Sequence, residues 1–297
     1  MKILLLGKNG QVGWELQRAL APLGELIAVD RTQVDLAEPE QLRAFVANCA
    51  PDIIVNAAAY TAVDKAETEI ELAYKINAES VAVLAEEVKK LNAWLIHYST
   101  DYVYDGTKIT DYLETDSVNP LSVYGQSKLA GENAIRQSGC KYLNFRTSWV
   151  FATKGNNFIK SMLRLASERT ELKIVADQVG APTSAELIAD VTTLCIHQLT
   201  SNTEQFANER IGTYHLVANG EATWHTYAQH VINKASELGQ RLSTPSENIL
   251  PINTDDYPLP AARPKNSKLN TNKLEQAFSI NLPVWPVYVD RMLEELI

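Results

Sequence analysis

Short apolar runs alternate with longer helical patterns along the first half of the chain. Buried strands are predicted at Lys2–Leu6, Leu26–Val29, Asp52–Val55, Trp94–Tyr98 and Tyr142–Phe145, where apolar and β-branched residues cluster. Apolar strands separated by helices are typical of parallel βαβ units, because helices cover both faces of such a sheet. The pattern therefore predicts an α/β fold with a doubly wound parallel sheet.

The segments between these strands carry apolar residues at helical spacing. Helices are predicted over Val12–Leu23, Glu40–Asn48 and Ile70–Leu91, and a fourth from about Tyr124 to Ser138. Each of them connects one predicted strand to the next, as a doubly wound sheet requires.

The regular alternation of apolar strands and helical segments ends after Trp149. From Thr213 onward the chain is more irregular and richer in proline. A helix over Phe158–Ala166, a strand at Lys173–Val175 and a helix over Leu187–Leu199 are predicted in this half. We expect a main domain and a smaller C-terminal α/β lobe, with a soft boundary because no linker separates them. The expected residues are 1–150 and about 176–205 for the main domain, and about 151–175 and 206–297 for the lobe.

Composition and charge narrow the classes of function. The chain has 297 residues, 45% hydrophobic and 21% charged, which are values of an ordinary globular protein. Its formal net charge of −9 disfavours nucleic acid as a partner. No apolar run reaches the roughly 18–20 residues of a membrane span, and the N-terminal run is too short for a signal peptide. The 3 cysteines form no metal or redox spacing. We expect a soluble cytoplasmic protein that does not bind membranes.

A glycine-rich turn follows the first predicted strand. Gly7, Gly10 and Gly13 stand at GxxGxxG spacing, directly before the first predicted helix. In this context the glycines let the backbone approach a pyrophosphate, and the free N–H groups of the helix N-terminus bind it. The alternative is a tight turn that binds nothing. The motif predicts a dinucleotide site.

Two residues at the end of the second strand have opposite preferences. Asp30 can accept hydrogen bonds from a ribose 2′-OH, which favours NADH. Arg31 can pair with a 2′-phosphate, which favours NADPH. We therefore expect both cofactors to be used. Asp35 and Leu36 lie where a loop could cover adenine, although Asp35 could instead serve only as a helix cap.

A tyrosine and a lysine four residues apart mark the start of the fourth helix. Tyr124 and Lys128 lie on one helix face. A nearby ammonium favours the phenolate, so we expect Lys128 to lower the pKa of Tyr124 from its ordinary value near ~10. Tyr124 could then act as a general acid or base near neutral pH. Such pairs also occur on solvent-facing helices, so the prediction depends on what surrounds them.

Thr100 belongs to the segment Ser99-Thr100-Asp101 after the fourth predicted strand. Ligands gather at the carboxyl ends of parallel strands, so Thr100 should point into the site and donate to a carbonyl oxygen. A turn residue that bonds its own backbone is the alternative. Together with the glycine turn and the Tyr124–Lys128 pair, Thr100 predicts hydride transfer between a nicotinamide and a carbonyl or alcohol.

Several motifs resemble the extended short-chain dehydrogenase/reductase family. They are the glycine turn, Asn56-Ala57-Ala58, Asn77, and Pro120-x3-Tyr124-x3-Lys128-x3-Glu132. Longer stretches are similar to family members that reduce nucleotide-linked keto sugars; among them are DIIVNAAAYTAVDKAE at 52–67, HYSTDYVYDG at 97–106 and RPKNSKLNT at 263–271. The resemblance covers essentially the whole chain. It implies a Rossmann fold and NADPH- or NADH-dependent reduction of the C4 keto group of dTDP-4-dehydro-6-deoxy-L-mannose.

The resemblance also implies a role for each matching residue. Tyr124 would protonate the sugar O4 as hydride reaches C4, Lys128 would lower the pKa of Tyr124 and hold the nicotinamide ribose, and Thr100 would polarise the carbonyl. The residues implied in cofactor binding are Gly7, Gly10, Gln11, Val12, Gly13, Asp30, Arg31, Asp35, Leu36, Ala59, Tyr60, Thr61, Tyr98, Tyr124 and Lys128. Those implied in substrate binding are Thr100, Asp101, Trp149 and Arg263. Trp149 could instead be a core residue, and Arg263 a surface arginine.

A metal site and a dimer are implied only by the resemblance. Glu15, Glu186 and Glu295 match glutamates that some family members use at a Mg²⁺-linked dimer interface, and three carboxylates suit a hard cation. Solvated helix glutamates are the simpler interpretation. A homodimer is therefore expected, with magnesium at its interface as one alternative.

Two other functions stay open. A sugar-nucleotide epimerase of the same family would keep its cofactor bound and transfer no net hydride. A noncatalytic regulatory subunit would bind ligand without turnover, although a binding protein has no need of the set Thr100, Tyr124 and Lys128.

Overall fold

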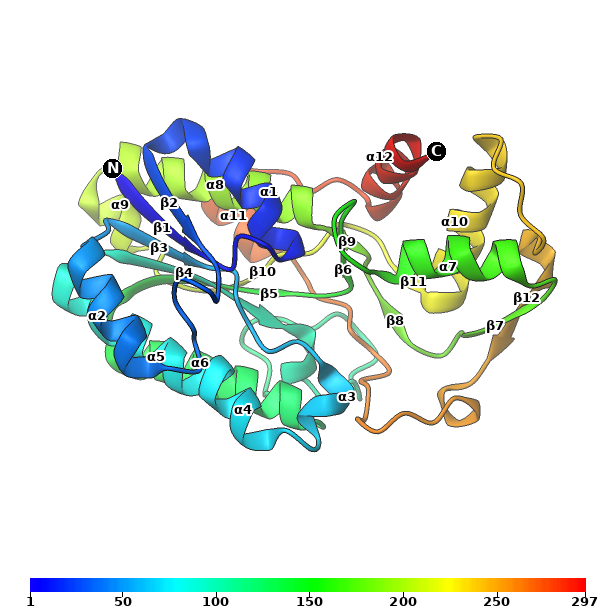
Figure 1. The fold of residues 1–297 in the computed structure, drawn as a ribbon, viewed down its shortest axis with the longest axis horizontal. Helices are drawn as coiled ribbons and strands as arrows, with labels where there is room; N and C mark the ends of the chain where they lie inside the picture. Colours follow the sequence, from blue (N-terminus) through cyan, green and yellow to red (C-terminus); the bar gives the residue numbers. More distant parts are fainter.

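The computed structural model describes residues 1–297 and shows a six-stranded parallel sheet beside a smaller lobe (Figure 1). The strand order is β10-β5-β4-β3-β1-β2. The strands are β1 (Lys2–Leu6), β2 (Glu25–Val29), β3 (Ile53–Asn56), β4 (Trp94–Thr100), β5 (Lys141–Thr147) and β10 (Gly212–His215). Leu6 pairs with Val29 on one side and Asn56 on the other, so the strands end at one common edge. The order reverses between β1 and β3, which is where doubly wound sheets bind ligands.

Helices cover both faces of this sheet, which confirms the predicted fold class (Figure 1). One face carries α1 (Gln11–Leu20), α8 (Ala185–Ser201), α9 (Glu204–Asn208) and α11 (Asn272–Phe278). The other carries α2 (Pro39–Cys49), α4 (Ile70–Tyr74), α5 (Ser80–Leu91) and α6 (Val123–Ser138). In β1, Leu5 belongs to the first core and Leu4 to the second, because neighbouring strand residues face opposite sides.

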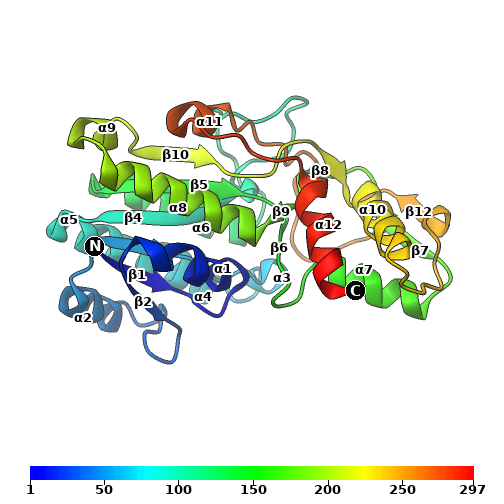
Figure 2. The ribbon, with the colours of Figure 1, turned by 90° about the horizontal axis from the view of Figure 1, so that it is seen from above.

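The smaller lobe has its own apolar core, and Figure 2 shows α7, α10 and α12 gathered at one end of the molecule. Its helices are α7 (Phe158–Glu168), α10 (Trp224–Glu237) and α12 (Trp285–Leu296). Its strands, which pair in twos, are β6 (Val150–Phe151), β7 (Leu172–Val175), β8 (Val179–Gly180), β9 (Thr183–Ser184), β11 (Ala222–Thr223) and β12 (Ile249–Ile252). None of the helices in the molecule combines the length and apolarity that a membrane crossing requires.

The division into units differs from the one expected from the sequence. The expected lobe included all of 206–297, but β10 completes the main sheet beside β5. Leu274 and Phe278 of α11 also fill the core under α8. The chain therefore crosses back to the main unit twice, because the edge of the sheet and the apolar face of α8 both need covering.

The predicted helix over Ile70–Leu91 contains one π-helical turn, Lys75–Glu79, between α4 and α5. Asn77 lies in this turn, and its side chain accepts from the Tyr60 N–H and donates to the Tyr60 carbonyl, at 2.9 and 3.0 Å. Such single turns often occur at functional sites. Here the wide turn holds the segment after β3 next to the edge of the sheet. The short helix α3 (Val63–Ala66) follows that segment.

Candidate active site

A cavity of about 1060 Å³ lies at the carboxyl ends of β1 to β5 and reaches the smaller lobe. Its size is at the upper end for a single small ligand, so it can hold a dinucleotide with part of a second molecule. The predicted site residues that line it are Gly7, Gly10, Gln11, Val12, Asp30, Arg31, Asp35, Leu36, Ala59, Tyr60, Thr61, Tyr98, Thr100, Asp101, Tyr124, Lys128 and Trp149. The structure thus brings most of the predicted positions to one place.

The glycine turn connects β1 to α1 at the floor of this cavity. Gly7 adopts a φ of +84°, and its N–H donates to the Val29 carbonyl at 3.0 Å, so the turn folds back over β2. A Cβ on Gly10 would meet nothing closer than 3.4 Å, which leaves its cavity side open for a ligand. Gly13 does not line the cavity: a Cβ there would lie 2.0 Å from the Gly7 oxygen. Its place in the motif therefore serves the close packing of helix on turn.

Asp30 at the end of β2 is an ionised acceptor. The Thr32 hydroxyl and N–H donate to its Oδ1 at 2.6 and 2.9 Å, and Asn9 donates to Oδ2 at 2.8 Å. These bonds, with the Thr32 side chain first, hold the pKa of Asp30 below its usual value. Arg31 is exposed at the rim and makes no hydrogen bond or ion pair. Asp35 accepts from the Ala37 N–H at 2.9 Å, so it caps a turn while lining the cavity.

Tyr124, Lys128 and Thr100 all border the cavity. Ser122 caps α6 by accepting from the Gly125 N–H at 3.2 Å, which sets Tyr124 in the first turn of the helix. A Cβ on Gly125 would lie 2.3 Å from the Tyr102 oxygen, so a glycine lets the helix approach the end of β4 closely. β4 extends through Thr100, which is therefore the last strand residue, whereas the prediction ended the strand at Tyr98.

The Thr100 hydroxyl combines local bonds with a contact to the tyrosine. It donates to Asp101 Oδ1 at 3.0 Å and accepts from the Tyr102 N–H at 3.2 Å, so the expected turn alternative is also present. The Thr100 side chain also acts to lower the pKa of the Tyr124 phenol. Burial raises the pKa of Asp101 to about 6.

The expected effect of Lys128 on Tyr124 is wrong in this structure. Burial raises the pKa of Tyr124 to about 12, opposed by the Thr100 hydroxyl and reinforced by the charge of Asp101. Lys128 does not offset this rise. Its Nζ donates to the Tyr98 carbonyl at 2.6 Å, and burial lowers its own pKa to about 8. The desolvation of the phenol exceeds the neighbouring charge effects, and the lysine faces the backbone of β4.

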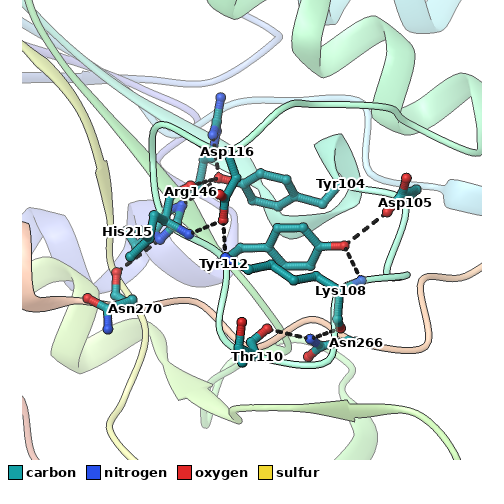
Figure 3. Close-up of polar contacts among 11 residues, drawn as sticks. Tyr104, Asp105, Lys108, Thr110, Tyr112, Asp116, Arg146, His215, Asn266 and Asn270 are labelled. Atoms are coloured by element: carbon teal, nitrogen blue, oxygen red, sulfur yellow. Dashed lines mark hydrogen bonds and ion pairs between the residues drawn. The ribbon is translucent and has the colours of Figure 1, made fainter.

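A buried polar network joins α6 to the neighbouring strands, and Figure 3 shows its members Tyr104, Arg146 and His215. Glu132, two turns after Tyr124, accepts from Arg146 Nε and Nη2 at 2.9 and 2.6 Å. Arg146 Nη1 donates to the Tyr104 hydroxyl at 2.6 Å, and that hydroxyl lies 2.8 Å from His215 Nε2. The network ties α6 to β5, β10 and the segment after β4.

The loop that follows Thr100 is also held by the C-terminal segment. Tyr112 stacks on Tyr104 with ring centres 4.1 Å apart, and Figure 3 shows its hydroxyl pointing to Asp105, 3.0 Å away. Asn266 donates to the carbonyls of Lys108 and Thr110 at 2.6 and 2.9 Å. The loop that follows Thr100 is thus fixed on both sides, which keeps the hydroxyl of that threonine in place.

Arg263 is not among the residues that line the cavity. Its Nη1 and Nη2 donate to the two oxygens of Asp64 at 2.6 and 2.7 Å. The Ala261 N–H donates to the same carboxylate at 3.1 Å. The pair joins the C-terminal segment to α3, and the guanidinium holds the pKa of Asp64 below its usual value. Asp64 occupies both ends of the Arg263 guanidinium, and the role of this arginine in substrate binding stays a prediction.

The glutamates Glu15, Glu186 and Glu295 line a separate cavity of about 240 Å³. Arg291 lies 3.1 Å from Glu186 and 3.5 Å from Glu295, and Arg18 lies 3.7 Å from Glu15. No group of three or more His, Cys, Asp or Glu side chains is close enough to hold a metal ion. The residues of one chain do not fit magnesium, because arginines already pair with the carboxylates.

Sequence reasoning missed an aromatic wall. Trp149 adopts a φ of +48°, and its indole stacks on Trp224 of α10 with ring centres 3.7 Å apart. Gly180 lies behind Trp149, where a Cβ would meet the indole at 2.8 Å. Trp149 is thus a cavity residue and not only a core residue. The pairing with Trp224 joins residues from both units, so no local pattern in the sequence could indicate it.

This arrangement, with a glycine turn and a hydroxyl-bearing set at one edge of a doubly wound sheet, is that of the dinucleotide-binding oxidoreductases. Within that class, the chain belongs to the family described as "RmlD substrate binding domain", whose model matches residues 1–297.

Named relatives and solved structures agree with this placement. The chain is 54% identical over 300 residues to the dTDP-4-dehydrorhamnose reductase of Escherichia coli (strain K12), covering 100% of this chain and 98% of the relative. A crystal structure of a dTDP-4-dehydrorhamnose reductase from Clostridium acetobutylicum superimposes with a TM-score of 0.90 at 35% identity, covering 100% of this chain and 99% of that one. The enzyme from Bacillus anthracis, solved in complex with NADP, gives a TM-score of 0.88 at 34% identity, with 99% of each chain covered.

Proposed function

We propose that the protein catalyses the NAD(P)H-dependent reduction of the C4 keto group of dTDP-4-dehydro-6-deoxy-L-mannose, which yields dTDP-L-rhamnose. The observation that carries the proposal is the meeting of Thr100, Tyr124 and Lys128 with the glycine turn in one cavity. The relatives named as dTDP-4-dehydrorhamnose reductases support the choice of sugar.

Each site residue has its own role in the reduction. A bound nicotinamide cofactor supplies the hydride. The Thr100 hydroxyl turns its one proton from Asp101 Oδ1 to the C4 carbonyl oxygen and stabilises the negative charge that develops there. Tyr124 gives its proton to that oxygen. The raised pKa of Tyr124, about 12, keeps the phenol protonated at neutral pH, which is the form that a reduction needs. Lys128 borders the same cavity and would hold the nicotinamide ribose.

We infer that both NADPH and NADH serve as cofactor. The N–H groups at the start of α1 and the open side of Gly10 suit the pyrophosphate. Asp30 is fixed as an ionised acceptor for a ribose hydroxyl. Arg31 is exposed beside it and free to pair with a 2′-phosphate. Trp149 and Asp101 are proposed as the contacts to the sugar.

The proposal is tested by turnover with the dTDP-linked keto sugar, run separately with NADPH and NADH. One cofactor oxidised per sugar reduced is expected, whereas sugar conversion without net oxidation would indicate the epimerase. The Tyr124→Phe variant should lose at least about a hundredfold in kcat. The exposed Tyr257 provides the matched control Tyr257→Phe, which should keep full activity. Binding of both ligands without turnover in the unmodified protein would indicate the regulatory subunit.

We further propose a homodimer in the cytoplasm. Arg18 and Arg291 pair with Glu15, Glu186 and Glu295 and offset part of their negative charge, so two copies can meet there without a metal. Sedimentation at equilibrium should give a dimer whose association does not change between excess Mg²⁺ and excess chelator. A monomer would contradict the proposal, and dissociation by chelator would restore the magnesium alternative. Cell fractionation tests the location.

A further inference from the structure

A buried histidine stands directly behind the lysine of the site. His97 of β4 is 1% exposed, and its imidazole lies between Asn56 of β3 and Lys128 of α6. Its Nδ1 is 3.3 Å from Asn56 Nδ2, and its Nε2 is 3.4 Å from Lys128 Nζ. Burial, together with the charge of Lys128, holds the pKa of His97 well below its usual value. The ring is therefore neutral and carries one proton, on one of its two nitrogens.

The backbone decides which nitrogen carries that proton. Asn56 Oδ1 accepts from the Ala58 N–H at 3.2 Å, and an N–H can only donate. The amide oxygen of Asn56 is thereby fixed, so its NH₂ group faces His97 and donates to Nδ1. A nitrogen that accepts carries no proton, so the proton lies on Nε2. The opposite tautomer would require the Asn56 amide to turn its NH₂ group against the Ala58 N–H.

The Nε2–H of His97 consequently points at Lys128 Nζ. A neutral amine accepts this hydrogen bond with its lone pair, while an ammonium has three donors and no acceptor. The neutral amine can also donate one N–H to the Tyr98 carbonyl, 2.6 Å away, and keep the other for the cavity. A single donor–acceptor chain thus runs from the Ala58 N–H through Asn56, His97 and Lys128 to the Tyr98 carbonyl.

We propose that His97 is a positioning residue for the reduction. Its Nε2–H donates a hydrogen bond to Lys128 Nζ and so favours the neutral amine of Lys128 over the ammonium. The proposal rests on the proposed function, in which Lys128 and Tyr124 share one cavity. The other charges near the lysine act differently. Glu132 favours the ammonium, but Arg146 binds both of its oxygens. Asp101 and Tyr124 line the same cavity as the lysine.

With this hydrogen-bond chain in place, Lys128 can release a proton during the reaction and recover one afterwards. Tyr124 passes its proton to the sugar oxygen, and the ammonium of Lys128 then returns a proton to the phenolate across the cavity that both residues line. His97 stabilises the neutral amine that this transfer leaves, without losing its own proton. Lys128 regains a proton from solvent as the products leave, so the balance per turnover is one hydride and one proton taken up by the sugar. Burial acts in the same direction, because it lowers the pKa of Lys128 to about 8.

The first test reads the tautomer directly in the full-length protein. Nitrogen-15 NMR of histidine-labelled protein separates ring nitrogens that carry a proton from those that do not. The protein has 5 histidines, and the His97 signals are assigned by their loss in His97→Phe. We expect a proton on Nε2 and none on Nδ1 from about pH 6 to about pH 9. The exposed His197 is the control for a ring that averages its tautomers. A proton on Nδ1, or on both nitrogens, would overturn the proposal.

The second test reverses the tautomer. Asn56→Asp keeps one oxygen for the Ala58 N–H and offers a second to Nδ1, which draws the ring proton there and turns Nε2 into an acceptor for the ammonium. The alkaline limb of the kcat/KM profile should move up by about one pH unit, a tenfold gain in proton affinity. The same change made in His97→Phe measures the through-space effect of the added charge alone, and should move the limb by less than half as much. Equal shifts in both backgrounds would overturn the proposal.

Failure of the proposed function has a different signature. A protein that does not oxidise NADPH or NADH with the keto sugar refutes the reductase, whatever the state of His97. A protein that does so with its ring proton on Nδ1 refutes only the role of His97.

Discussion

The buried pair Glu132–Arg146 allows a sharp test of how the site is supported. Its side chains are 1% and 3% exposed, and two hydrogen bonds of 2.9 and 2.6 Å join them. Glu132→Gln keeps the shape but removes the charge, and its NH₂ group faces a donor of Arg146. The guanidinium would then be buried without a counter-charge. Removing one partner of such a pair costs about 3–5 kcal/mol of unfolding free energy.

Urea denaturation followed by circular dichroism measures this cost at neutral pH. Glu168→Gln is the matched control, because Arg164 and Glu168 form an exposed pair at 3.1 Å, with side chains 61% and 53% exposed. An exposed pair at this spacing contributes only about 0.3–0.5 kcal/mol. A loss below about 1 kcal/mol in Glu132→Gln, or one equal to that of the control, would refute the view that this pair holds α6 in place.

Three further predictions follow from particular contacts. Arg31→Ala should raise the KM for NADPH about tenfold with little change for NADH, measured in initial rates; equal effects on both would contradict a 2′-phosphate contact. Gly13→Ala should destabilise the protein strongly in thermal unfolding, since its Cβ would lie 2.0 Å from a backbone oxygen, whereas Gly10→Ala, with 3.4 Å of room, should fold and weaken only cofactor binding. Burial lowers the pKa of His215 to about 3 and that of His97 well below its usual value, so these two rings take up protons on unfolding below about pH 6.5, and they outnumber Asp101, whose raised pKa acts in the opposite direction. The urea concentration at the unfolding midpoint should therefore decrease as the pH is lowered from about 7 to about 5.5. A constant midpoint would refute the neutral state of these rings.

The sequence by itself determined the elements and the core of the site. Continuous apolar strands such as Lys2–Leu6, separated by helices, are enough to predict a parallel sheet buried on both faces. The glycine turn and the spacing of Tyr124 and Lys128 are local patterns, and their places follow from the carboxyl ends of the strands. These features could be predicted because each depends on neighbours only a few residues away.

Tertiary structure decided the charges, partners and boundaries. The direction of the pKa shift of Tyr124 depends on how deeply the phenol is buried, which spacing alone does not contain. Arg263 pairs with Asp64, 199 residues away in the chain. In the same way, Trp224 completes the wall of the cavity from the other lobe, and β10 returns to the main sheet. Local periodicity reports which face of an element is apolar, but burial and pairing depend on which distant surfaces the fold brings into contact.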